Sequence, residues 1–127
     1  MKRFIKIVTD ILLVIVLVIP AVLYIPRLMG LKTYKVLSGS MEPEYHVGSV
    51  VYVEKSSIDD IEVGDVITFY INDNTVVTHR VIDKDDDTES FRTKGDANEI
   101  EDGGSVAYDK VVGKVVLNVP YLGYILR

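Results

Sequence analysis

The sequence contains no cysteine and no tryptophan, and its only histidines are His46 and His79. The absence of cysteine excludes disulfide bonds and thiolate metal sites, so any fold must be held together by its apolar core. Basic surface is scarce as well, because the formal net charge is −5 and every acidic residue except Asp10 lies beyond residue 31. Nucleic-acid binding is therefore disfavoured, since it needs a basic face to neutralise phosphates.

Charge is missing altogether from one long stretch, Ile11–Pro26, which lies between Asp10 and Arg27. With its apolar flanks this run reaches the roughly 20 residues that span a bilayer. A buried core helix would alternate apolar with polar positions. A cleavable signal peptide would end in small residues, whereas this run ends in Leu23-Tyr24-Ile25-Pro26. The pattern favours a retained membrane anchor.

Basic residues precede the apolar run at Lys2, Arg3 and Lys6. Because positive flanks stay in the cytoplasm, the N-terminus is expected to be cytoplasmic. The sequence thus predicts a cytoplasmic tip and single transmembrane anchor over residues 1–31. Residues 32–127 are expected to form one β-rich domain on the extracytoplasmic face of the cell membrane.

Beyond the anchor the pattern changes to short β-type segments, and none keeps a helical period for three turns. Val66–Ile71 and Thr75–Ile82 flank the turn-forming Asn72-Asp73-Asn74, which predicts a β-hairpin. Further strands are expected at Val50–Val53, Phe91–Thr93 and Val111–Val119, the last with a bulge at Gly113. We therefore expect a mostly β fold, a small antiparallel sheet or partly closed barrel, after one N-terminal transmembrane helix.

The acidic segment 83–89 resembles the start of a calcium-binding loop. Such a loop also needs glycine at its sixth position and glutamate at its twelfth. Thr88 and Lys94 occupy those positions here. A solvated hairpin tip is the favoured interpretation, and we expect neither a metal ion nor a cofactor.

A possible nucleophile, Ser40, lies shortly after the apolar run, in the stretch VLSGSMEPEY. Serine and glycine are ordinary turn residues, so this stretch alone favours a turn. A serine becomes a nucleophile only when a neighbouring base takes its proton. His46 is near in sequence but lies in a turn-rich segment, whereas His79 lies inside a predicted strand, where a base can be aimed accurately.

Two acids could orient such a histidine: Asp96, within Lys94–Asn98, and Asp102. Gly95 and Asn98 indicate tight loop geometry around Asp96. A carboxylate held in such a loop can orient an imidazole, as in a Ser-His-Asp arrangement, but an Asx-turn is the commoner use of such an aspartate. Both acids remain candidates.

Taken together and in this order, the motifs resemble those of the type I signal peptidases. The motifs are SGSMEP at 38–43, GDVI at 64–67, THRV at 78–81, KGDAN at 94–98, GKV at 113–115 and VPYLGY at 119–124. The resemblance covers nearly the whole chain. The common bacterial branch of that family has lysine where this sequence has His79. Histidine there resembles the branch found in the endoplasmic reticulum, in archaea and in some Gram-positive bacteria.

The resemblance implies a membrane-bound serine endopeptidase that removes N-terminal signal peptides from exported preproteins after small residues. It implies an acyl-enzyme on Ser40, with His79 as general base and Asp96 or Asp102 as supporting acid. Asp96 is preferred because it belongs to the tighter motif. The Ser38 hydroxyl and the Ser40 N–H would bind the oxyanion. The implied partners are signal peptides and the lipid bilayer.

Two alternatives stay open. LexA-like self-cleaving relatives share the serine-containing fold, but they normally use a lysine base, so His79, the anchor and the acidic charge disfavour them. A non-catalytic, membrane-anchored β-domain would bind or scaffold, and it would tolerate the loss of Ser40 and His79. Many members of the histidine-containing branch continue into a second hydrophobic helix, whereas this sequence stops at Arg127.

Overall fold

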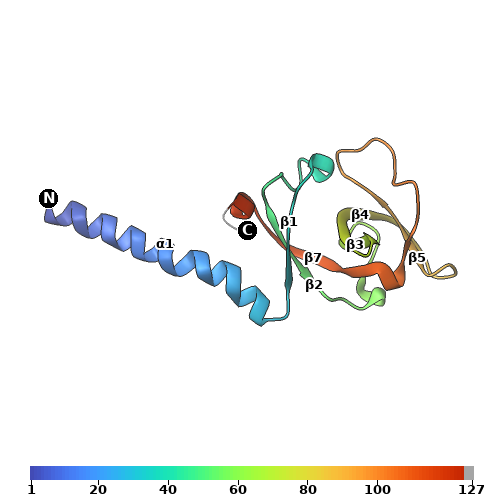
Figure 1. The fold of residues 1–127 in the computed structure, drawn as a ribbon, viewed down its shortest axis with the longest axis horizontal. Coiled ribbons are helices and arrows are strands. Elements are labelled where there is room, and N and C mark those ends of the chain that lie inside the picture. The colour runs from blue at the N-terminus through green and yellow to red at the C-terminus, as the bar shows by residue number, and fades with distance from the viewer. Residues whose placement is uncertain (125–127) are drawn as a thin grey trace. The chain divides into compact units, whose positions relative to one another are not determined.

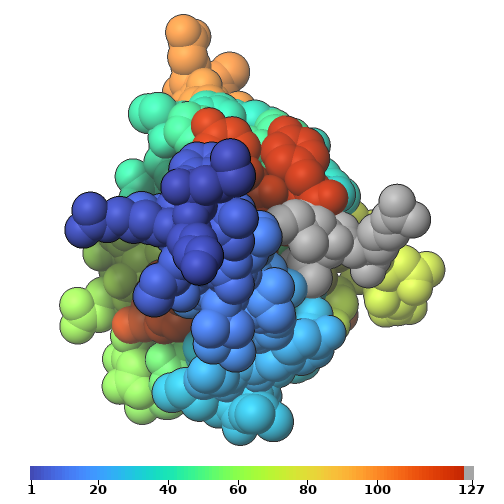
Figure 2. All heavy atoms as spheres, turned by 90° about the vertical axis from the view of Figure 1, so that its left-hand side faces the viewer, coloured from blue at the N-terminus to red at the C-terminus, as the bar shows by residue number. Residues whose placement is uncertain are grey.

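The computed structural model describes residues 1–124, and the chain separates after Leu31 into a helical unit and a β unit. The helix α1 runs from Lys2 to Leu28 and includes Pro20 and Pro26. None of its residues is buried, and its side chains are visible as blue spheres in Figure 2. At 1.5 Å per residue it is about 40 Å long. Its mean hydropathy of 2.7 over the most apolar window makes it apolar enough, as well as long enough, to cross a membrane.

The β unit is one seven-stranded sheet in which every neighbouring pair is antiparallel (Figure 1). Its strands are β1 (Lys32–Lys35), β2 (Val50–Glu54), β3 (Val66–Asn72), β4 (Thr75–Asp85), β5 (Ser90–Lys94), β6 (Val106–Ala107) and β7 (Val111–Val119). Their order across the sheet is β1-β2-β7-β3-β4-β5-β6. The last long strand thus lies between β2 and β3, and the expected mostly β, antiparallel fold is confirmed.

The hairpin of β3 and β4 forms where the alternating pattern predicts it, with Phe69 opposite Val77. β4 runs three residues further than expected, to Asp85, before the turn that leads into β5. The register of β7 against β3 shifts at the residue beside Gly113. A Cβ on Gly113 would lie 2.0 Å from the Glu54 carbonyl oxygen, so the glycine is needed for close backbone approach.

The core consists of two apolar clusters. Ile67 and Phe69 of β3 belong to one cluster, and Val66 of the same strand belongs to the other. Because neighbouring residues of a strand point to opposite faces, the two clusters cover opposite faces of β3. The first cluster also contains Ile61, Val81, Phe91 and Val106, and the second contains Met41, Tyr45, Val51 and Val53.

Candidate active site

Ser40 lies in the middle of a short 3-10 turn, Gly39–Met41. The next side chain, Met41, is only 2% exposed and packs in the second core cluster, which fixes one side of the turn. The Ser40 carbonyl accepts a 2.9 Å hydrogen bond from the Ala97 N–H, which fixes the other side. The turn expected from serine and glycine is therefore present, and the core holds it in place.

The loop that contains Ala97 packs closely against this turn. A Cβ on Gly95 would lie 2.6 Å from the Ser40 carbonyl oxygen and 2.7 Å from the Asn98 amide nitrogen. Only glycine fits at this position without moving one of its neighbours. The Asp96 N–H points at the Met41 sulfur, at 3.4 Å. The 94–98 motif therefore supports the backbone of Ser40.

His79 lies on β4 opposite Ile67, and it is 8% exposed. Its Nε2 is 3.1 Å from the Ser40 Oγ, and its Nδ1 is 2.7 Å from the Asp102 Oδ2. A carboxylate only accepts hydrogen bonds, so the Nδ1–H donates to Asp102 and Nε2 keeps its lone pair. Nε2 can then accept the proton of the Ser40 hydroxyl. The edge of the His79 ring also packs against Phe69, with 6.4 Å between ring centroids.

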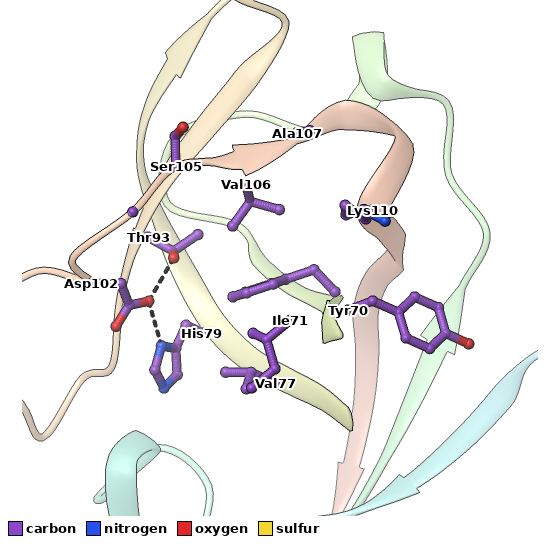
Figure 3. A pocket seen from close by; sticks show the side chains of 12 residues that line it. Tyr70, Ile71, Val77, His79, Thr93, Asp102, Ser105, Val106, Ala107 and Lys110 are labelled. Carbon is purple, nitrogen blue, oxygen red and sulfur yellow. Dashed lines mark hydrogen bonds and ion pairs between the residues drawn. The ribbon is translucent and has the colours of Figure 1, made fainter. Parts of the chain in front are cut away.

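Asp102 is held by Thr93, a residue that the sequence did not single out. The Thr93 hydroxyl donates a 2.6 Å hydrogen bond to the same Asp102 oxygen that faces His79 (Figure 3). The Asp102 N–H in turn donates to the Thr93 carbonyl, at 2.9 Å. Thr93 is 1% exposed on β5, so both contacts are rigidly placed. Its position directly before the 94–98 motif was the one sequence signal that could have found it.

Asp96 lies elsewhere and does not contact His79. Its two carboxylate oxygens accept hydrogen bonds of 2.8 and 2.7 Å from the Arg80 guanidinium, which also donates to the Gly64 carbonyl at 2.7 Å. These hydrogen bonds hold the pKa of Asp96 below its ordinary value and raise that of Arg80. The preferred acid thus ties its loop to β4, and Asp102 is the acid that the structure places against the imidazole.

The Arg80–Asp96 pair makes a prediction about stability. Replacing Asp96 with asparagine is expected to lower the free energy of unfolding of the β unit by about 1–2 kcal/mol at pH 7. Because folding lowers the Asp96 pKa, its contribution is present above the ordinary value of 3.8 and is lost as the pH falls toward the lowered value. Urea unfolding of the full chain in detergent, followed by circular dichroism at pH 7 and pH 3, measures this.

The matched control is Glu99→Gln, which removes an exposed charge from the same loop. The difference in the free energy of unfolding between Asp96→Asn and the wild type should be smaller at pH 3 than at pH 7. The free energy of unfolding of Glu99→Gln should stay close to that of the wild type at both pH values. An equal loss for Asp96→Asn at both pH values would show that the ion pair is not the cause.

The other predicted residues lie as follows. The Ser38 Oγ is 3.1 Å from the Ser40 Oγ, so the two hydroxyls share a hydrogen bond. His46 pairs with Glu42 on the surface and does not contact Ser40. Within residues 1–124, no group of three potential His, Cys, Asp or Glu ligands is placed to hold a metal ion.

Two pockets flank the His79 ring. The first, the Ser40 pocket, has a volume of about 400 Å³ and is lined by residues that include Val36, Ser38, Ser40, Met41, Val76 and Thr78. The second, the Asp102 pocket, has a volume of about 550 Å³ and is lined by residues that include Phe69, Ile71, Thr93, Asp102, Val106 and Lys110 (Figure 3). Val77 and His79 line both pockets.

A serine, a histidine and an aspartate joined by hydrogen bonds beside a pocket form the arrangement that serine hydrolases use. A family model described as signal peptidase, peptidase S26, matches residues 6–88, which include Ser40 and His79. The chain belongs to this family, as its motifs indicated.

Curated relatives agree with this assignment. Signal peptidase I W of Bacillus subtilis (strain 168) is 43% identical over 89 residues, which cover 68% of this chain and 47% of the relative. Signal peptidase complex catalytic subunit SEC11C of Homo sapiens is 35% identical over 101 residues, covering 71% and 53%. SEC11 of Fusarium vanettenii is 33% identical over 101 residues, covering 71% and 59%. The chain spans about half the length of the curated relatives it matches.

Proposed function

We propose that this chain is a membrane-bound serine endopeptidase that removes signal peptides from exported preproteins. The observation that carries the proposal is the hydrogen-bonded series Ser40–His79–Asp102, which opens onto a pocket in a chain of the signal peptidase family. Ser40 attacks the scissile carbonyl while His79 Nε2 accepts its proton, and Asp102 stabilises the resulting imidazolium. The products of this step are an acyl-enzyme and, after His79 returns the proton, the leaving amine. Water then completes the cycle.

The tetrahedral oxyanion needs donors close to the nucleophile. The Ser38 hydroxyl lies 3.1 Å from the Ser40 Oγ, and it can turn to donate once Ser40 has formed its bond to the substrate. We assign the oxyanion to this hydroxyl and the Ser40 N–H. This pairing keeps both donors within the same turn, which Met41 and Gly95 hold in place.

The substrate has an open strand edge to bind. β4 pairs with β3 along one side, but on its other side it pairs with β5 only from Arg80 onward. Among the described strands, none pairs with that other edge over residues 75–79. An extended peptide can add to such an edge by main-chain hydrogen bonds. Its residues before the cut would then lie along Val76 and Thr78, over the Ser40 pocket.

The Ser40 pocket, of about 400 Å³, is where we expect small side chains to bind. Met41, which is almost fully buried, and Val36 contribute apolar walls beside the nucleophile. We propose that these walls receive the small first and third residues before the cut. Alternate residues of an extended peptide point to the same side, which is why those two positions share one pocket.

The membrane topology follows from α1 and its basic N-terminal flank. We propose that α1 crosses the membrane once, with Lys2, Arg3 and Lys6 in the cytoplasm. The β unit would then work on the extracytoplasmic face, where signal peptides emerge. Ser40 follows the end of α1 by only 12 residues in the sequence, which keeps the nucleophile within reach of the bilayer surface.

The test is cleavage of a preprotein by the full chain reconstituted in phospholipid vesicles. We expect one cut, located by N-terminal sequencing of the product, directly after a small residue at the end of the signal peptide. Preproteins with tryptophan in place of that small residue serve as the control and should stay intact. A chain that binds the preprotein and cleaves none of it would support the non-catalytic alternative.

A further inference from the structure

The Asp102 pocket lies on the opposite face of β4 from the Ser40 pocket. Val76 and Thr78 line only the Ser40 pocket, whereas Phe69 and Ile71 of β3 line only the Asp102 pocket. Val77 and His79, which alternate with Val76 and Thr78 along β4, line both. The two pockets therefore meet at the open edge of β4, where Ser40 and His79 also meet.

Successive side chains of an extended peptide point to opposite faces. Consider a peptide that is added to the edge of β4, with its first and third residues before the cut in the Ser40 pocket. The side chain of its second residue before the cut must then point to the opposite face. The pocket on that other side is lined by Val77 and His79 of β4, and it reaches Ile71 on β3 as well as Thr93 on β5. The Ser40 pocket likewise includes Val76, which precedes His79 on β4. Both pockets thus include residues of β4 that precede His79, where the acyl side of the peptide lies in the proposed function.

We propose that the Asp102 pocket binds the side chain of the second residue before the cut. This inference rests on the proposed function. The Asp102 pocket has a volume of about 550 Å³, which exceeds the 400 Å³ of the Ser40 pocket. Phe69, Val77 and Val106 give the Asp102 pocket apolar walls. The pocket accepts a long apolar side chain, in contrast to the small residues on either side. In Figure 3 Ile71 and Val77 lie close together and Val106 lies apart from them, with His79 and Asp102 at one side.

Occupancy of this pocket also has a consequence for the catalytic groups. Asp102 and Thr93 line it beside His79, so a bound apolar side chain covers their shared hydrogen bond from water. A hydrogen bond between charged and polar groups is stronger in a drier environment. A long second residue therefore favours kcat as well as binding.

Ile71 offers the cleanest test, because it lines the pocket and is 59% exposed, so folding does not depend on it. Peptides with alanine, leucine or phenylalanine as the second residue before the cut, otherwise identical, are compared by kcat/KM in detergent. The wild type should prefer leucine and phenylalanine. Ile71→Trp fills the pocket and should lower the ratio of phenylalanine to alanine by roughly tenfold or more, the effect of one or a few methylene groups in an apolar pocket. Ile71→Ala should keep or raise that ratio.

Val63 is the matched control, because it is also 59% exposed and lines neither pocket. Val63→Trp should leave the ratio unchanged. If Ile71→Trp cleaves all peptides with the wild-type ratio, the inference fails while the proposed function stands. If the wild type itself cleaves none of the peptides and no preprotein, the proposed function fails first.

A charge exchange tests the same pocket independently. Lys110 lines it from the segment before β7, and Lys55 is an exposed lysine outside it. Two peptides are compared, one with glutamate and one with lysine as the second residue before the cut. Lys110→Glu should lower the ratio of kcat/KM for the glutamate peptide to that for the lysine peptide. Each exposed ion pair that is lost or gained should change this ratio by roughly two- to fivefold. Lys55→Glu should not shift it. Equal ratios in both variants would place the second residue outside the pocket.

Discussion

Replacing Ser40 with alanine is expected to lower the rate of preprotein cleavage by about a million-fold, the loss found when the nucleophile or base of a triad is removed. His79→Ala should cost about the same. The Ser40 Oγ is the atom that bonds to the substrate, and His79 Nε2, 3.1 Å away, is the group placed to take its proton. The two changes together should cost little more than either alone, because each already removes the whole unit.

His46→Ala is the control for this pair. His46 is the other histidine of the chain, it lies six residues after Ser40, and it pairs with Glu42 rather than with the nucleophile. Cleavage of one preprotein in detergent, with thermal unfolding measured for each variant, separates loss of catalysis from loss of fold. Wild-type rates in Ser40→Ala, with a folded variant, would overturn the serine mechanism. Loss of activity in His46→Ala alone would mean that the base had been assigned to the wrong histidine.

The parts of the fold that could be predicted from the sequence are those whose local pattern is strong. The β3–β4 hairpin has two alternating apolar segments around an Asn-Asp-Asn turn, and the structure confirms it. β1 and β6 were not predicted, because Lys32–Lys35 and Val106–Ala107 are too short to show a period. β1 and β6 are strands only because each one pairs with a neighbouring strand, β2 and β5 respectively. Such pairing depends on the tertiary structure and cannot be seen in the local sequence.

Some parts of the site can likewise be predicted from the sequence, and others cannot. The sequence points to Ser40 and His79 because one lies in a turn after the anchor and the other in a strand, and the structure brings them together. No local pattern could tell which acid reaches His79. The tight loop around Asp96 suggested an orienting acid, but its tightness arises from Gly95 packing on the Ser40 backbone and from the pairing with Arg80.

The two acids are expected to differ strongly when each is replaced with asparagine. Asp102→Asn should lower kcat by about ten-thousand-fold, the usual loss when the acid of a triad is neutralised. If the amide nitrogen faces Nδ1, it donates to the ring and places the proton on Nε2, so His79 can no longer accept the Ser40 proton. If the amide oxygen faces Nδ1, the ring keeps its tautomer but the imidazolium loses the negative charge beside it.

Asp96→Asn should lower kcat far less, by roughly tenfold, because it loosens the loop behind Ser40 without touching His79. The pair is compared at one pH with the same preprotein, and each variant is checked for folding, since Asp96→Asn also lowers stability. A profile of kcat against pH adds a second readout. Asp102→Asn should change its acid limb, because that limb reports the ionisation of the base in the complex, whereas Asp96→Asn should leave it in place. The reverse order of losses would show that the carboxylate lying 2.7 Å from His79 Nδ1 is not the acid that supports it during the reaction.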